Sequence, residues 1–228
     1  MPPSTTQAYA PAAAEVAKIL LDIKAVNFRP EQPYILTSGH ASPVYIDCRK
    51  IISFPKERSI IIKHMAAATK AMKFDAYAGG ETAGIPFAAW LAHEMNAPML
   101  YIRKKPKGFG RNAQIEGDLK DNSKVLLVEE LATDGGSKVN FVNALRTASA
   151  EVTHSIVIFY YGAFPLSPEF TSLGINLIHL CTWKDVLAVA ESGKYFDAAK
   201  IEGVKQFLAD PITWSHAHGG GLKEKAAS

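Results

Sequence analysis

The sequence has few cysteines and no long apolar run. Its 228 residues include only two cysteines, Cys48 and Cys181, which lie far apart and match no metal-ligand spacing. We therefore expect free thiols in a reducing compartment. No apolar stretch approaches the roughly 20 residues of a membrane-spanning helix, and the first residues lack the basic and apolar segments of a secretory signal. Together these absences predict a cytosolic protein.

An excess of charge of one sign is also lacking. Lysine and arginine number 25 against 22 aspartate and glutamate residues, which leaves a net charge of only +3. This excess is too small to predict a nucleic-acid-binding surface, so any basic site must be local. The hydrophobic fraction of 48% over this length is typical of one globular domain with a sizeable core.

The most informative stretch is KVLLVEELATDGGSK, at residues 124–138. Its apolar block Val125–Val128 shows no alternation, which is typical of a buried parallel strand. The Gly-Gly-Ser turn places free backbone N–H groups at the start of a helix-compatible run, where anions bind. Glu129 and Glu130 cannot bind phosphate, but they can accept hydrogen bonds from sugar hydroxyls. The order of strand, acid pair, anion loop and helix predicts a pocket for a ribose that carries a phosphate.

A second strand–loop–helix unit comes earlier in the chain. Residues 75–78 are expected to form a strand that runs into GGETAGIPFAAW. Thr82 can cap the following helix, and Pro86 suits its first turn. A purely structural turn is the alternative interpretation of this short motif. Two such loops after neighbouring parallel strands would face one crevice, where open α/β sheets bind ligands.

A third expected strand, at residues 98–102, ends in a strongly basic segment. Five cations fall within nine positions and follow neither a helical nor a strand period: Arg103, Lys104, Lys105, Lys107 and Arg111. A solvated charged loop is the ordinary explanation of such a run. Its start at the end of a strand, and the proline and glycines within it, favour instead a lid over a polyanion.

The alternation of strands and helices over residues 56–180 predicts an α/β fold with a parallel sheet and helices on both faces. Residues 1–55 are expected to hold a disordered tail (1–12), a helix and a small hood, 56–210 the core, and 211–228 a C-terminal tail that is loose from residue 216. Helices are expected at 13–26, 55–72, 139–145, 183–192 and 197–209, and further strands at 34–37, 44–47, 155–161 and 175–180.

Four blocks of the sequence resemble, in their order, the orotate phosphoribosyltransferases among the type I phosphoribosyltransferases. VLLVEELATDGGSK resembles the signature for phosphoribosyl diphosphate (PRPP), and TSGHASPVYIDCRK the N-terminal Ser-Gly-x-x-Ser-Pro segment. GGETAGIPFAAW resembles the pyrophosphate loop, and YIRKKPKGFG the catalytic loop. The resemblance implies a type I phosphoribosyltransferase-like open parallel sheet flanked by helices, with a small N-terminal hood.

The implied activity is the formation of orotidine 5′-monophosphate and diphosphate from orotate and PRPP, in pyrimidine (UMP) biosynthesis. A phosphoribosyltransferase for another base is one alternative. The resemblance of the N-terminal hood segment to that of the orotate enzymes disfavours it. A non-catalytic PRPP-sensing regulator on the same fold is another. Such a regulator usually needs a nucleic-acid-binding part or a strong basic surface, and neither is evident here.

The resemblance also implies roles for individual residues. Arg103, Lys104 and Lys107 would be catalytic, because they would neutralise the diphosphate as charge develops on it. Glu129 and Glu130 would accept hydrogen bonds from the ribose hydroxyls. The other PRPP-binding residues would be Leu131, Ala132, Thr133, Asp134, Gly135, Gly136 and Ser137. The pyrophosphate loop would comprise Gly80, Glu81, Thr82 and Ala83, and the orotate-binding residues would be Thr133, Val44 and Tyr45.

Mg²⁺ is the implied cofactor, held mainly by PRPP, with no metal-ligand set expected in the protein itself. The implied partners are PRPP, orotate and a second copy of the chain, whose lid would reach the neighbouring site and exclude water; no nucleic acid and no membrane are expected.

The sequence departs from well-known members of the family at several positions. Glu130 is usually Asp, Phe109 replaces a His, and Thr37 and Ala83 replace Lys in some members. The Arg that some use for the orotate carboxylate has no counterpart in FYYGAFP.

Overall fold

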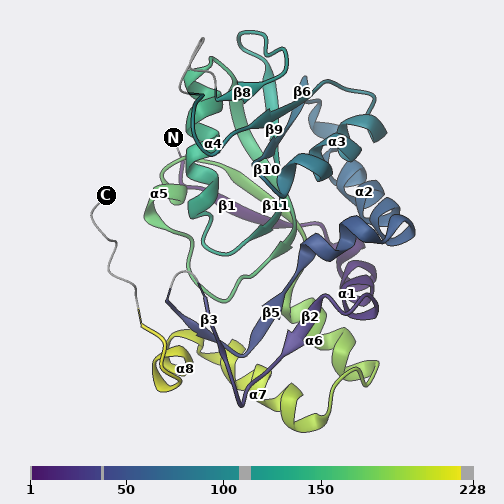
Figure 1. The fold of residues 1–228 in the computed structure, drawn as a ribbon, viewed down its shortest axis with the longest axis vertical. Coiled ribbons are helices and arrows are strands. Elements are labelled where there is room, and N and C mark those ends of the chain that lie inside the picture. Colours follow the sequence, from purple (N-terminus) through teal and green to yellow (C-terminus); the bar gives the residue numbers. More distant parts are fainter. Residues whose placement is uncertain (1, 37–38, 108–113, 222–228) are drawn as a thin grey trace.

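A central sheet organises the protein, whose computed structural model describes residues 2–36, 39–107 and 114–221 (Figure 1). In this part of the chain the sheet has seven strands in the order β1-β11-β10-β9-β6-β7-β8. The strands are β1 (Thr5–Ala8), β6 (Ala76–Gly80), β7 (Met99–Ile102), β8 (Ile115–Glu116), β9 (Lys124–Ala132), β10 (Glu151–Tyr160) and β11 (Asn176–Thr182). All neighbouring pairs are parallel except β7 and β8. The predicted α/β class with a parallel sheet is therefore confirmed, and β8 is an antiparallel addition that the sequence analysis did not anticipate.

Helices cover both faces of this sheet, as predicted (Figure 1). Val125 and Leu127 of β9 pack on the face that α4 and α5 cover, whereas Leu126 and Val128 pack on the opposite face. This alternation explains why the run Val125–Val128 is apolar at every position, because both faces of β9 are buried there. The helices over the two faces are α1 (Ala13–Asp22), α2 (Pro55–Thr69), α3 (Gly84–Glu94), α4 (Gly136–Thr147), α5 (Pro168–Thr171) and α6 (Trp183–Ser192).

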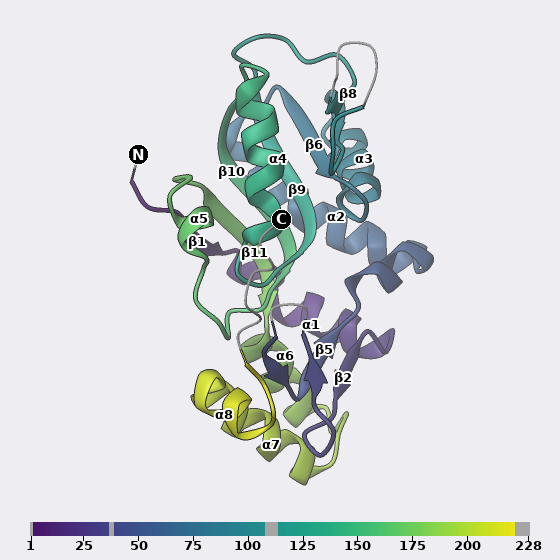
Figure 2. The ribbon, with the colours of Figure 1, turned by 60° about the vertical axis from the view of Figure 1, so that its left-hand side comes forward.

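The hood lies beyond the carboxyl end of β11 and combines segments from both ends of the chain (Figure 2). Phe28 of the hood stacks on Phe196 at a ring-centroid distance of 4.3 Å and lies 6.1 Å from the ring of Trp183. These contacts tie the N-terminal strands to the last helices. The hood elements are β2 (Val26–Phe28), β3 (Tyr34–Ile35), β4 (Ala41–Ser42), β5 (Val44–Ile46), α7 (Ala198–Ala209) and α8 (Pro211–Ala217). Short 3₁₀ helices occupy Ala10–Ala12, Cys48–Ser53 and Lys70–Met72.

The expectation that residues 1–12 are disordered is wrong for the described part. Strand β1 pairs with β11 in parallel, and the Ser4 hydroxyl donates to Phe170 O at 2.7 Å and accepts from Ile175 N at 2.8 Å. All four residues of β1 are exposed, so backbone pairing at the sheet edge orders them. Hydrophobic patterning cannot detect a strand of this kind.

The expectation of a loose tail from residue 216 is also wrong as far as residue 221. His216 lies in α8, whose first turn is capped by the Asp210 carboxylate accepting from Thr213 N at 3.1 Å. The Ser215 hydroxyl accepts from Ala41 N at 2.8 Å, and Gly221 N donates to Gly39 O at 3.0 Å. The Asp-Pro-x-Thr pattern was the missed signal of this helix start.

Two further local expectations need correction. The first helix ends at Asp22 rather than residue 26, because Val26 already belongs to β2. Thr82 does not cap α3, whose N-cap is Ala83 without a side-chain hydrogen bond. Among the described residues, no helix combines the length and apolar character needed to cross a membrane.

Candidate active site

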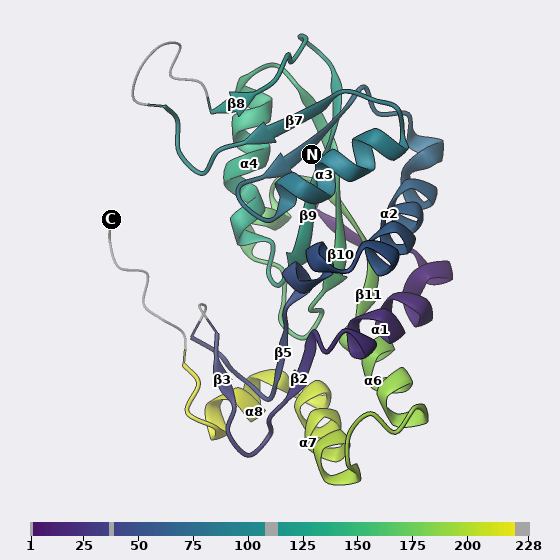
Figure 3. The same ribbon diagram turned by 45° about the vertical axis from the view of Figure 1, so that its right-hand side comes forward.

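Three loops meet at the carboxyl ends of the adjacent strands β6, β7 and β9 (Figure 3). Glu81, directly after β6, donates its backbone N–H to Ile102 O at 2.8 Å. Its carboxylate accepts from the backbone N–H of Lys104 at 2.7 Å, and the Lys104 carbonyl accepts from Asn140 of α4 at 3.0 Å. The structure thus brings the predicted pyrophosphate loop, the start of the basic segment and the helix after the acid pair into one hydrogen-bonded unit.

The two adjacent carboxylates of β9 leave the strand on opposite sides. Glu129 points to the α4 side, where its Oε2 lies 3.6 Å from the Lys138 Nζ. Glu130 points to the other side, where its Oε1 lies 3.4 Å from the Arg49 Nε. Strand β9 continues to Ala132, so the two-residue strand period still applies at the acid pair. The strand predicted from the apolar block ends at Val128, so the divergence of the two carboxylates was not predicted.

Two glycines create the space that the Glu129 carboxylate occupies. Gly80 lies beside Glu129 in the sheet, one position beyond the paired residues Gly79 and Val128. A Cβ at Gly80 would overlap Glu129 Oε1 and stand 2.5 Å from a ring carbon of Phe141. A Cβ at Gly84, the first residue of α3, would also overlap Glu129 Oε1. The carboxylate therefore fills a gap between the β6–α3 turn and α4.

Burial governs the chemistry of this carboxyl group. Glu129 is 7% exposed, and burial raises its pKa to about 7, although the nearby Lys138 ammonium opposes that rise. Lys138 is itself 1% exposed and donates to Leu131 O at 2.7 Å. Lys138 had no predicted role. It could have been found as the polar member of the buried helix face that Phe141, Val142 and Leu145 complete, spaced three, four and seven residues on.

The predicted phosphate loop connects β9 to α4. Gly135 adopts a left-handed conformation with φ of 81°, and a Cβ there would stand 2.5 Å from the Phe170 ring. The Asp134 carboxylate accepts from Gly136 N at 3.0 Å, so an anionic group already contacts the N-terminus of α4. In the last two residues of β9, the carbonyls of Leu131 and Ala132 accept from Lys138 and from Tyr161 N at 2.7 and 2.8 Å. Thr133 is half-buried and Ser137 is exposed.

The basic segment leaves the sheet between β7 and β8. Lys107 Nζ lies 2.5 Å from Glu116 Oε1, and Arg103 Nη1 lies 3.8 Å from the same oxygen. Arg103 N donates to Gln114 O, and the Gln114 amide donates back to Arg103 O, both at 2.8 Å. The Nε of Arg103 is buried and has no hydrogen-bond partner among the described residues. Phe109 and Arg111 lie outside the described part of the chain.

The predicted orotate-binding residues of the hood face different ways. Val44 is fully buried, and its carbonyl accepts from the Tyr161 hydroxyl at 2.8 Å. Its neighbour Tyr45 is 44% exposed, and its ring lies 5.3 Å from that of Tyr34. Within this strand, only the Tyr45 side chain is open to a ligand. Thr37, in the same predicted block, lies outside the described residues.

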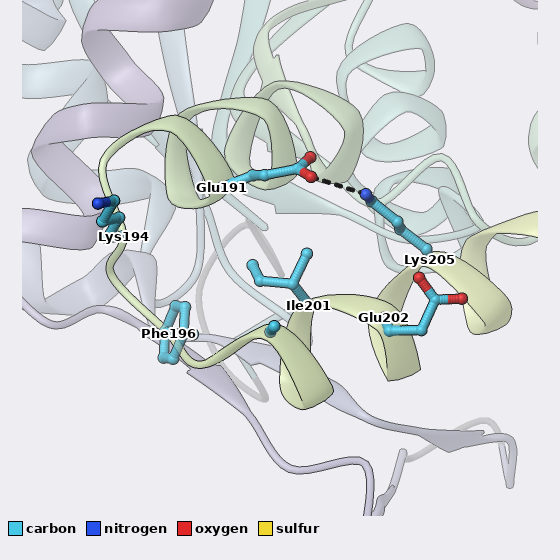
Figure 4. A pocket seen from close by; sticks show the side chains of 7 residues that line it. Glu191, Lys194, Phe196, Ile201, Glu202 and Lys205 are labelled. Atoms are coloured by element: carbon cyan, nitrogen blue, oxygen red, sulfur yellow. Dashed lines mark hydrogen bonds and ion pairs between the residues drawn. The ribbon is translucent and has the colours of Figure 1, made fainter.

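One pocket lies between α6 and α7 and shares no residue with these loops (Figure 4). Its lining carries side chains of both charges, and Lys205 donates to Glu191 at 2.8 Å across the pocket. The lining residues are Glu191, Lys194, Phe196, Ala198, Ile201, Glu202 and Lys205. None of these residues had a predicted function.

Known proteins resemble the chain both in sequence and in structure. It is 52% identical over 210 residues to an orotate phosphoribosyltransferase of Agrobacterium fabrum, with 90% of each chain covered. The structure matches the orotate phosphoribosyltransferase of Aeropyrum pernix with a TM-score of 0.67 and 27% identity, over 80% of this chain and 99% of that one. It also matches the UMP synthase of Leishmania donovani with a TM-score of 0.75 and 28% identity, over 87% of this chain and 42% of that longer one. No protein-family model matches the chain.

Proposed function

The chain belongs to the orotate phosphoribosyltransferase family of enzymes, and we propose that its three converging loops bind PRPP and transfer its phosphoribosyl group to orotate. A ring nitrogen of orotate gives up its proton to solvent and attacks C1 of the ribose, the bond from C1 to the diphosphate breaks, and orotidine 5′-monophosphate and diphosphate form. The observation that carries this proposal is the pair of hydrogen bonds that connects Glu81, after β6, through Lys104, after β7, to Asn140 of α4. These hydrogen bonds connect the predicted pyrophosphate loop to α4, the helix that follows the predicted phosphate loop.

The phosphate and the diphosphate would bind at separate parts of this crevice. The 5′-phosphate would replace the Asp134 carboxylate at Gly136 N, at the N-terminus of α4. The diphosphate would lie between the loop from Gly80 to Ala83 and the cations Arg103, Lys104 and Lys107. Fixed cations at this position stabilise a transition state in which negative charge moves onto the leaving group.

The acid pair has two roles on this proposal, because its members diverge. Glu130, on the side of Arg49 and the hood, would accept from the ribose hydroxyls. Glu129 packs against Gly80 and pairs with Lys138, so it would hold the pyrophosphate loop against α4. It would contact the ribose only from the α4 side of the sheet. Tyr45 and Thr133 would line the place of the orotate ring.

Magnesium suits the donors at this site. Mg²⁺ prefers oxygen ligands and commonly uses one or two carboxylates together with substrate phosphates, and Glu130 offers such oxygens at the end of β9. The ion would neutralise charge on the diphosphate of bound PRPP.

We also propose a homodimer, since the basic segment leaves from the sheet edge formed by β7 and β8, where it can reach a second copy. Sedimentation with and without PRPP tests this assembly.

The fall in orotate absorbance after adding PRPP and Mg²⁺ tests the activity itself. Orotate consumption that depends on both additions supports the proposal. Turnover with a purine and none with orotate would instead indicate a transferase for another base. PRPP binding without turnover of any base would indicate a regulator that only senses PRPP.

A further inference from the structure

Glu116 is an acidic residue placed among the cations of the basic segment. It lies in β8, directly opposite Tyr101 of β7, and its side chain is 25% exposed. A single carboxylate oxygen, Oε1, contacts Lys107 at 2.5 Å and Arg103 at 3.8 Å. The backbone pairing of β7 with β8 fixes its position, because Ile102 and Ile115 form the next pair of the ladder. The paired edge strand β8 therefore presents one anion to two of the proposed catalytic cations.

The Glu116 carboxylate satisfies these cations only in part. The Arg103 contact is too long for a hydrogen bond, and the buried Arg103 Nε has no acceptor among the described residues. Buried polar groups are normally paired, so an unpaired guanidinium N–H favours an additional anionic partner. A diphosphate has several oxygens and can pair closely with both cations at once, whereas the Glu116 carboxylate pairs closely only with Lys107.

We propose that Glu116 is a positioning residue that competes with the diphosphate group for Lys107 and Arg103. This inference rests on the proposed function, because it takes the diphosphate of PRPP as the ligand of these cations. In the unliganded protein Glu116 holds the Lys107 ammonium beside β8 and offsets the charge of that ammonium. Diphosphate binding has to displace this contact, so the apparent affinity is reduced in proportion to the fraction of protein in which Lys107 is free of Glu116. When diphosphate leaves, Glu116 takes Lys107 back.

The expected size of this competition is modest. Both side chains are partly exposed, at 34% for Lys107 and 25% for Glu116, so solvent screens their attraction. Exposed ion pairs of this kind shift an equilibrium by about two- to fivefold. The Glu116→Gln variant keeps the shape of the side chain and removes its charge. We expect it to bind Mg²⁺-diphosphate and Mg²⁺-PRPP with a Kd lowered by that factor, with KM for PRPP falling and kcat nearly unchanged.

Calorimetric titration of Mg²⁺-diphosphate at low salt provides the direct test. The matched control is Glu191→Gln, which removes an ion pair of similar length, 2.8 Å to Lys205, in the pocket between α6 and α7 (Figure 4). We expect no change of Kd in this control. In a Lys107→Ala background, Glu116→Gln should lose most of its effect, because the competition acts through Lys107. Circular dichroism of each variant checks the fold.

An unchanged or raised diphosphate Kd in folded Glu116→Gln overturns the inference. The same holds if the effect persists undiminished without Lys107, or if the wild-type protein binds no diphosphate. If Glu116→Gln does not fold, Glu116→Asp, which withdraws the carboxylate by one methylene, should lower Kd in the same direction, and an unchanged value would refute the competition. Absence of orotate turnover in the wild-type protein would refute the proposed function, whereas the ratio of diphosphate Kd values would still decide the role of Glu116.

Discussion

Replacing Gly80 with alanine should destabilise the protein and displace a site carboxylate. The added methyl group would overlap Glu129 Oε1 and stand 2.5 and 2.7 Å from two ring carbons of Phe141. Neither neighbour can move freely, because Glu129 and Phe141 are both buried. Overpacking of this kind costs about 1–3 kcal/mol. Displacing Glu129 from Lys138 disturbs a buried ion pair as well, so we expect a loss of about 2–4 kcal/mol in the free energy of unfolding.

Urea unfolding monitored by circular dichroism measures this loss, provided that the slope of the transition is unchanged. Gly136→Ala is the matched control, since the nearest atom to its added Cβ would be an Asp134 oxygen at 3.4 Å, an ordinary contact. We expect that control to be neutral or more stable by about 0.4–1 kcal/mol. A Gly80→Ala protein within about 0.5 kcal/mol of the wild type would refute the tight fit around Glu129.

The remaining predictions concern charge at the site. Lys107→Ala should lower kcat far more than it weakens PRPP binding, because its contact strengthens in the transition state; unchanged kcat would remove Lys107 from the mechanism. Glu130→Asp should keep or raise kcat, and a large loss would show that the longer side chain, with its Arg49 contact at 3.4 Å, is required. The Glu129 carboxyl should titrate near pH 7 in ¹³C NMR, with Glu129→Gln for assignment. Titration between pH 4 and 5 would contradict its burial.

The direction of the Glu129 effect on stability follows from its raised pKa. The folded protein holds this proton more tightly than an unfolded chain, in which the carboxyl has its ordinary pKa of about 4.5. Its contribution to the free energy of unfolding is therefore fully present below pH 4.5 and declines as pH rises through about 7. The difference between the pH profiles of wild type and Glu129→Gln isolates this contribution.

Sequence patterns predicted the sheet well because its central strands are buried on both faces. The run Val125–Val128 is apolar for that reason, and the structure places it in the first half of β9. Strand β1 was missed because only backbone pairing orders it, and its exposed side chains leave no apolar pattern. Helix α8 was missed because its order depends on capping and on contacts with the distant hood residues Gly39 and Ala41.

The site was predictable in its loops but not in the direction of its side chains. Motif order located the two loops and the basic segment, because parallel strands end at one edge of a sheet. The divergence of Glu129 and Glu130 depends on how far β9 continues, which no local pattern determines. Helical spacing could place Lys138 on the buried face of α4, but it could not identify Glu129 as its partner. The pairing of Glu116 with Lys107 arises from tertiary packing, so spacing could not predict it.

The most direct test of phosphoribosyl transfer is the identity and ratio of the products. Phosphorus NMR of the wild-type protein with orotate, PRPP and Mg²⁺ should show orotidine 5′-monophosphate and diphosphate appearing in equal amounts as PRPP disappears. Ribose 5-phosphate with diphosphate and no nucleotide would show that water, rather than orotate, attacks C1. Unchanged PRPP with intact orotate would contradict the assignment of the three converging loops as a transferase site.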